Sequence, residues 1–207
     1  NFYNRLLKKH GDNTNKALGR YDLSKSKKKF DFVINHINDV YKGKKLNVLD
    51  IGCGIGQFLK SRNLDIKKIN YTGIDVANES INYCRSKFKK ESNFLTKDIF
   101  EKNAQSNYFL KLKSKCNIVF SVGTIEQKNF LSSENNLIYF IKNSLKFTKK
   151  NGYIIFDYFY RENLDFTNSD CNYLPLKKII NISKRFSSNI KLNFNVSKFE
   201  VLVSLKV

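Results

Sequence analysis

Several residue types and sequence features are rare or missing in this 207-residue chain. Methionine is absent and the chain opens on asparagine, so we expect its native start to lie upstream of Asn1. Pro175 is the only proline, and there is no internal repeat, low-complexity segment or linker. No apolar run approaches the ~18–20 residues that a bilayer-spanning helix needs. Residues 1–10 also lack the apolar segment of a secretion signal, so we expect no membrane insertion.

Cysteine is sparse as well, since Cys53, Cys84, Cys116 and Cys171 lie about 30 or more residues apart. No pair of them has the C-x-x-C or Cys/His spacing of a zinc site, so no metal is expected. Isolated cysteines of this kind are typically buried free thiols in a reducing compartment. The cysteine pattern therefore predicts a cytoplasmic protein.

Acidic residues are few relative to basic ones. Lysine and arginine number 38 against 18 aspartates and glutamates, which gives a formal net charge of +20. A field of this sign favours anionic partners and accelerates their encounter. The lysines are spread over the whole chain, however, and no nucleic-acid-binding module is recognisable. Compositional bias, an anionic small substrate and nucleic acid therefore all stay open as the reason for the charge.

Short apolar runs alternate with helical patterns along most of the chain. The runs are rich in β-branched and aromatic residues, which indicates strands at 47–51, 71–74, 93–95, 117–122 and 153–158. Apolar residues at helical spacing predict helices at 31–41, 78–88, 134–147 and 176–186. The near-continuous apolar character of the strands favours a parallel sheet covered on both faces. Strand–helix alternation of this kind predicts an α/β fold built from βαβ units.

The last part of the chain has a different pattern. Two strand-like runs, 190–196 and 199–207, are separated by a short polar turn. They predict a hairpin, so we expect the sheet to finish with an antiparallel strand. A single core of ordinary size serves a chain of this length. We therefore expect one domain over 1–207, with a polar N-terminal arm or lid at 1–25 and the core at 26–207.

A glycine-rich loop follows the first predicted strand. Residues 48–59 (VLDIGCGIGQFL) place Gly52, Gly54 and Gly56 directly after Asp50 and Ile51. Glycine permits positive φ and lets the backbone approach a ligand closely. Such loops also occur in dinucleotide-binding folds, but a carboxylate beside the loop repels a pyrophosphate. S-adenosylmethionine instead carries an ammonium and a sulfonium, which Asp50 favours, so we predict this donor over NAD(P).

Further cofactor-binding candidates lie in the loop and at the ends of the next three strands. A carboxylate at Asp75, after the second strand, accepts hydrogen bonds from the two ribose hydroxyls of an adenosyl group in related arrangements. Asp98 and the apolar Ile99 follow the third strand, where they suit the amino group and face of an adenine. The fourth strand ends where ligands bind in open α/β sheets. The complete predicted set is Asp50, Gly52, Cys53, Gly54, Gly56, Phe58, Asp75, Val76, Asp98, Ile99, Ser121 and Val122.

Together these motifs resemble the class I (Rossmann-like) S-adenosylmethionine-dependent methyltransferase superfamily. Residues 50–56 are similar to its first motif, Asp75 to its acidic second-strand end, and Asp98 to its adenine-side acid. The resemblance covers about residues 45–207. It implies a seven-stranded sheet of order 3-2-1-4-5-7-6, with strand 7 antiparallel and helices on both faces. It also implies S-adenosylmethionine as cofactor and S-adenosylhomocysteine as product.

The N-terminal segment has a narrower resemblance. Residues 6–19 (LLKKHGDNTNKALG) are similar to the opening of a group of small bacterial methyltransferases with a K-x-H-G-D-x-x-x-K-A-L-G signature. Members of that group are sometimes linked to surface-glycan or small-metabolite pathways. The resemblance implies methylation of a small molecule in such a pathway.

The methyl acceptor is constrained mainly by which motifs the chain does not carry. Residues 121–124 read S-V-G-T where enzymes that methylate adenine N6 or glutamine have an N-P-P-Y or D-P-P-Y tetrad. We therefore predict an oxygen or nitrogen of a small, anionic acceptor: phosphorylated, nucleotide-linked or a sugar. A general base is needed only where the nucleophile loses a proton, and His10 and Glu126 are the candidates. An RNA or protein methyltransferase that docks through its basic surface, and a non-catalytic donor-binding protein, are the alternatives.

Overall fold

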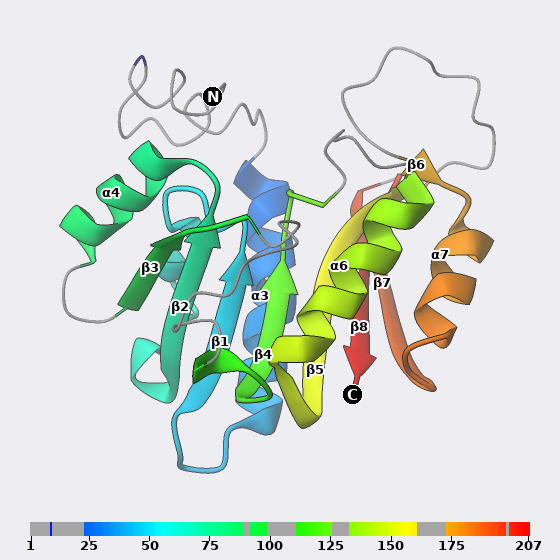
Figure 1. Cartoon of the computed structure of the whole chain (residues 1–207), viewed down its shortest axis with the longest axis horizontal. Helices are drawn as coiled ribbons and strands as arrows, with labels where there is room; N and C mark the ends of the chain where they lie inside the picture. Colours follow the sequence, from blue (N-terminus) through cyan, green and yellow to red (C-terminus); the bar gives the residue numbers. More distant parts are fainter. Residues whose placement is uncertain are drawn as a thin grey trace. The chain divides into compact units, whose positions relative to one another are not determined.

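A computed structural model describes Lys9 and residues 23–88, 92–98, 111–125, 133–160, 173–197 and 199–207. The chain divides into two compact units at Asp98, and each is described separately below. Figure 1 shows the elements of each unit by label and colour. None of the described helices is long and apolar enough to cross a membrane.

The first unit is a parallel sheet with helices. Its strands are β1 (Leu46–Ile51), β2 (Ile69–Asp75) and β3 (Ser92–Thr96), in the order β3-β2-β1. Its helices are α3 (Leu23–Val40), α4 (Asn78–Lys87) and the short 3-10 turns η1 (Gln57–Lys60) and η2 (Ile66–Lys68). The register aligns Asp50 with Gly73 and Ile51 with Ile74, so β1 and β2 end side by side. The loops that leave these two strands therefore emerge at the same edge.

Helix α3 begins earlier than the predicted residue 31. It starts at Leu23 and includes the densest lysine run of the chain. This first part of the helix is amphipathic. Ser26, Lys29 and Phe30 are buried, and their helical spacing continues the buried face that Val33 and Ile37 form further along. The prediction was wrong at this end because the polar run hides the few buried positions inside it.

The second unit pairs parallel and antiparallel strands. It contains β4 (Cys116–Ser121), β5 (Thr148–Tyr160), β7 (Asn189–Ser197) and β8 (Glu200–Lys206), in the order β4-β5-β8-β7. Strand β8 runs antiparallel to both neighbours, which confirms the predicted terminal hairpin. The two-residue β6 (Tyr173–Leu174) pairs with β5 and was not predicted. Helices α6 (Ser133–Phe147) and α7 (Leu176–Lys184) complete the unit (Figure 1).

The predicted α/β class is confirmed, as are the two halves 3-2-1 and 4-5-7-6 of the predicted strand order when β6 is set aside. Every residue of β4 is buried, as expected for a strand covered on both faces. Strand β5 starts at Thr148, ahead of the predicted residue 153, because the polar residues 149–151 continue the strand and were taken for a helix stop. The single-domain assignment stays a prediction.

Candidate functional site

The loop after β1 has the backbone conformation that its glycines permit. Gly52, Gly54 and Gly56 have φ values of 76°, 52° and 71°, a region that L-residues with a side chain rarely adopt. The backbone N–H groups of Gly52 and Cys53 both donate to the carbonyl of Ile74, at 2.8 and 3.0 Å. The loop is thus tied to the end of β2 from its first residue.

Two glycines let the loop pack tightly against its surroundings. A Cβ on Gly56 would lie 2.7 Å from Cε2 of Phe88, and a Cβ on Gly73 would lie 2.8 Å from Sγ of Cys53. Both distances are shorter than real contacts allow, so neither position accepts a side chain without movement of its neighbours. Gly73 was not singled out from the sequence, where it is one residue inside a strand pattern.

Asp75 joins the glycine loop to the turn that follows β2. Its Oδ2 accepts a hydrogen bond from the N–H of Gly54, and its Oδ1 accepts one from the N–H of Ala77, each at 2.8 Å. Burial raises the pKa of this half-buried carboxyl, while the N–H groups of Ala77, Gly54 and Val76 act in the opposite direction. A carboxylate has about four acceptor positions. Asp75 therefore keeps capacity for a ligand while it fixes the loop.

Asp50 lies beneath the loop and not on its surface. It is 4% exposed, and its Oδ2 accepts a hydrogen bond of 2.6 Å from the hydroxyl of Tyr71 on β2. Burial, followed by the charge of Asp50, raises the pKa of Tyr71 well above its usual value, so the phenol keeps its proton. Little of the Asp50 side chain is therefore accessible to a ligand in this structure. Tyr71 was missed from the sequence because a tyrosine in a strand is usually a core residue.

Two cysteine thiols pack behind the same loop. Sγ of Cys84 on α4 donates to the carbonyl of Gly54 at 3.3 Å. The pKa of Cys53 is raised well above its usual value by a hydrogen bond with Cys84, by burial and by the charges of Asp50 and Asp75. Cys53, Cys84 and Cys116 are all free and buried, as expected for structural thiols. Both thiols support the loop, and the raised pKa makes Cys53 a poor nucleophile.

The remaining first-unit candidates differ in exposure. The ring of Phe58 is 1% exposed and packs against Phe30 and Tyr71, so it supports the loop from the core. Val76 is 52% exposed, which is unusual for an apolar residue next to a buried strand. Asp98 is exposed two residues after β3. Solvent therefore reaches the side chains of both Val76 and Asp98.

A second loop follows β4 in the other unit. Ser121 and Val122 are 0% and 4% exposed, so neither residue offers accessible surface to a ligand in this structure. The N–H of Gly123 donates to both carboxylate oxygens of Asp157, at 2.8 and 2.9 Å. Nδ2 of Asn136 donates to the carbonyl of Ile125. The sequence did not identify Asp157 and Asn136 as the residues that hold this loop.

Three predicted residues, His10, Ile99 and Glu126, lie outside the described residues, as does the segment 10–19 of the N-terminal signature. Within the described ranges, no group of three or more His, Cys, Asp and Glu side chains is arranged to hold a metal ion.

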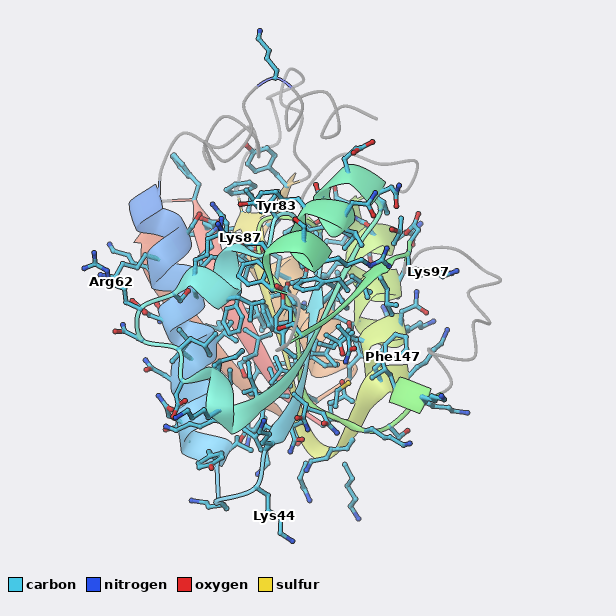
Figure 2. All side chains as sticks on the ribbon, turned by 90° about the vertical axis from the view of Figure 1, so that its left-hand side faces the viewer. Lys44, Arg62, Tyr83, Lys87, Lys97 and Phe147 are labelled. Carbon is cyan, nitrogen blue, oxygen red and sulfur yellow. The ribbon has the colours of Figure 1, made fainter. Side chains whose placement is uncertain are left out.

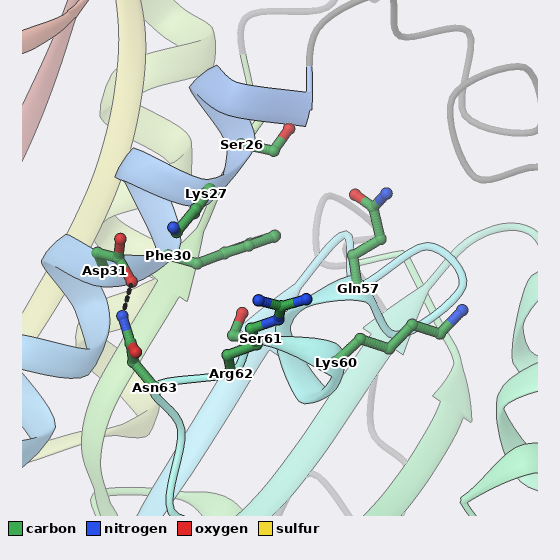
Figure 3. Close-up of a pocket in the computed structure, with 9 residues that line it drawn as sticks. All are labelled: Ser26, Lys27, Phe30, Asp31, Gln57, Lys60, Ser61, Arg62 and Asn63. Carbon is green, nitrogen blue, oxygen red and sulfur yellow. Dashed lines mark hydrogen bonds between the residues drawn. The ribbon is translucent and has the colours of Figure 1, made fainter.

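A cavity of about 340 Å³ lies beside the glycine loop, within the first unit. Helix α3 forms one wall, and the chain that follows Gly56 forms the other (Figure 3). The lining residues are Ser26, Lys27, Phe30, Asp31, Gln57, Lys60, Ser61, Arg62 and Asn63. Three of them are basic and one is acidic, so the cavity favours an anion.

The sequence matches a family model described as a methyltransferase domain over residues 42–200. No curated protein matches the chain. Among solved structures, a SAM-dependent methyltransferase from Leishmania major is similar with a TM-score of 0.70 and 13% identity, over 99% of this chain and 81% of that one. Magnesium protoporphyrin IX methyltransferase from Synechocystis, with bound SAM, is similar with a TM-score of 0.65 and 14% identity, over 100% of this chain and 91% of that one. The CurJ carbon methyltransferase is similar with a TM-score of 0.69 and 11% identity, and the match covers 94% of this chain but only 58% of the CurJ chain.

Proposed function

The chain belongs to the methyltransferase domain family, whose model matches residues 42–200, and we propose that it methylates an oxygen or nitrogen of a small anionic metabolite. S-adenosylmethionine is the family's methyl donor. The acceptor class that we propose is a phosphorylated, nucleotide-linked or sugar compound, as used in surface-glycan biosynthesis. Its support is the net charge of +20, which favours an anionic partner.

The residues at the end of β1 and β2 fit the donor. Asp75 presents a half-buried carboxylate with spare acceptor capacity, and Val76 beside it offers exposed apolar surface. These are the two features that an adenosyl group needs, a hydrogen-bond acceptor for the ribose and an apolar contact for the base. The arrangement around Asp75 is the single observation that carries the assignment of the donor site. Asp98 is proposed to accept a hydrogen bond from the adenine amino group.

Methyl transfer requires mainly that the protein aligns the donor with the acceptor. S-adenosylmethionine supplies a methyl group that its sulfonium has already activated. The chain's residues have to orient the donor and the acceptor and exclude water from between them. A base is needed only for an acceptor that loses its proton during attack, and we propose His10 or Glu126 for that role.

An RNA or protein methyltransferase is the second candidate, and the basic surface is what favours it. Lys44, Arg62 and Lys87 are exposed, and the side chains of Lys44 and Arg62 project from the ribbon in Figure 2. Docking of a polyanion through such side chains releases counterions, so affinity for RNA falls steeply as salt rises. Weak RNA binding that does not respond to salt contradicts this candidate.

Transfer of a labelled methyl group separates the candidates. The protein is incubated with S-[methyl-³H]adenosylmethionine and with metabolite, RNA and protein fractions of a bacterial extract. We expect label in the anionic small-molecule fraction, and we expect treatment with phosphatase and nucleotide pyrophosphatase to move that label from an anionic to a neutral compound. Label confined to RNA or protein contradicts the proposed acceptor class. Donor binding without label in any fraction favours a non-catalytic protein.

We also propose a cytoplasmic location. Three cysteines are buried as free thiols, and two of them, Cys53 and Cys84, pack against each other behind the loop. An oxidising compartment favours disulfide formation between neighbouring thiols, and a reducing one preserves them.

A further inference from the structure

We propose that the cavity between α3 and η1 is a phosphate-binding site that anchors the methyl acceptor. The proposal rests on the proposed function and assigns a binding site to the anionic group of its substrate. The cavity has a volume of about 340 Å³, which lies at the small end of the range for ligand pockets. It accommodates a phosphate with part of the molecule that carries it.

The positive charge of the cavity is only partly neutralised. The one acidic residue, Asp31, accepts a hydrogen bond of 2.9 Å from Nδ2 of Asn63, drawn as a dashed line in Figure 3. The ammonium of Lys60 is directed to α4, where it lies 3.5 Å from the hydroxyl of Tyr83 and 5.4 Å from its ring centroid. Lys27 and Arg62 are the other two cations of the lining, and Figure 3 shows the Lys27 ammonium on the side of Asp31.

Arg62 has the geometry of a phosphate ligand. Arg62 lines the cavity and is exposed, so its guanidinium is open to an anion that enters from solvent (Figure 3). The side chain has no hydrogen bond or ion pair with any other described residue. A planar guanidinium makes paired hydrogen bonds to phosphate or carboxylate oxygens, which a lysine does not. Lys27 adds a second positive charge from the opposite wall.

Neutral polar groups complete the site. Oε1 of Gln57 is buried and has no hydrogen-bond partner among the described residues. An unpaired buried acceptor is costly, so a ligand that brings a donor relieves it. The hydroxyls of Ser26 and Ser61 also line the cavity and donate to anions. Cations beside an unsatisfied acceptor suit a phosphate ester that carries a hydroxyl, such as a sugar phosphate.

The position of Gln57 links the cavity to the donor loop. Gln57 directly follows Gly56, so the cavity begins one residue beyond the glycines. A ligand in the cavity that reaches Gln57 therefore lies next to the loop that we assign to the donor. The donor's own carboxylate is the rival occupant, and competition between the two separates them.

Calorimetry at low ionic strength tests the site. Inorganic phosphate and glucose 1-phosphate are titrated into the full chain that is saturated with S-adenosylhomocysteine. We expect both to bind, and Arg62→Gln to weaken each by about tenfold or more, because two charged hydrogen bonds are lost. Arg62 is exposed, so this variant is expected to fold. Gln57→Leu is expected to weaken glucose 1-phosphate and leave inorganic phosphate unchanged.

Lys44→Gln is the matched control, since it removes the same charge from the turn before β1, away from Arg62 (Figure 2). It is expected to leave phosphate affinity unchanged. Equal phosphate affinity in Arg62→Gln and the wild type overturns the site, as does absence of phosphate binding. Phosphate that competes with S-adenosylhomocysteine assigns the cavity to the donor and also overturns it. Failure of the wild type to bind S-adenosylhomocysteine at all refutes the donor assignment instead.

Discussion

The loops after β1 and after β4 are each held by an aspartate, but the two carboxylates are used differently. Asp157 is 0% exposed, and both of its oxygens accept from one N–H, that of Gly123. Asp75 is half-buried, and its oxygens accept from two separate N–H groups, those of Gly54 and Ala77. The first carboxylate is enclosed by protein, whereas the second keeps a side open to a ligand.

Exposure separates a carboxylate that only holds a loop from one that can also bind a ligand. Both residues end up close to a loop glycine, so proximity to the loop does not distinguish them. Exposure does, since a carboxylate that binds a ligand must retain acceptor positions that solvent or ligand can reach. By this criterion Asp50, which is 4% exposed and bonded to Tyr71, belongs with Asp157.

Removal of Asp157 gives the largest expected effect on stability. Asp157→Ala removes the acceptor of the buried Gly123 N–H, and the loss of the buried side chain leaves a cavity beside β5. We expect the free energy of unfolding to fall by about 2–4 kcal/mol. Urea denaturation measures it, with Asp39→Ala on the exposed face of α3 as a control that changes stability by less than about 0.5 kcal/mol. A loss at Asp157 no larger than that of the control contradicts its structural role.

Removal of Asp75 is expected to act on donor binding more than on folding. Asp75→Ala deletes charge-assisted hydrogen bonds to the ribose and the bond that fixes Gly54. We expect the affinity for S-adenosylhomocysteine to fall by about 10–100-fold, which is roughly 1.4–2.7 kcal/mol. Calorimetric titration measures it, with Asp39→Ala as the control. An unchanged affinity would refute the binding role and place Asp75 with the structural acids.

The buried pair of Asp50 and Tyr71 sharpens the comparison further. Tyr71→Phe removes the donor of the 2.6 Å hydrogen bond and leaves the Asp50 carboxylate less well satisfied. We expect a stability loss of about 1–2 kcal/mol by urea denaturation, with little change in donor affinity. A large affinity loss without a stability loss indicates instead that Asp50 contacts the donor.

The pH dependence of donor affinity is the smallest effect. The pKa of Asp75 is raised by burial, so its carboxylate takes up a proton at a higher pH than an ordinary aspartate. Donor affinity is expected to fall by a few-fold as pH drops through that raised pKa, because a neutral carboxyl accepts less strongly. The effect of Asp75 on the free energy of unfolding runs the other way with pH. Its contribution to stability is present below the pKa that Asp75 has in the unfolded chain, and it is lost as pH rises through the higher pKa of the folded state. Titrations of S-adenosylhomocysteine from pH 7 downward test this, and an equal response in Asp75→Ala contradicts it.

Much of the fold was predictable because strand–helix alternation leaves a strong local signal. The strands at Asp50 and Asp75 and the terminal hairpin follow from apolar runs and turn residues alone. The start of α3 was not predictable, since only its packing shows which residues of the lysine run are buried. The same holds for β6, which is too short to leave a pattern.

The candidate site was predictable in its backbone and less so in its partners. Glycines at 52, 54 and 56 indicate positive φ at these positions, because few other residues adopt it. The hydrogen bonds of Tyr71 to Asp50 and of Gly123 to Asp157 join residues 21 and 34 positions apart. Such long-range pairs are set by strand register, which the sequence does not specify. The cavity at Arg62 likewise depends on how α3 packs beside η1.

Cofactor choice tests most directly whether the loop after β1 together with Asp75 binds a methyl donor. Wild-type protein is titrated by calorimetry with S-adenosylhomocysteine and, in parallel, with NAD⁺ and NADP⁺. We expect saturable binding of S-adenosylhomocysteine at micromolar concentration, with a binding free energy on the order of −8 kcal/mol, and no binding of either dinucleotide. Binding of a dinucleotide without binding of S-adenosylhomocysteine would contradict it.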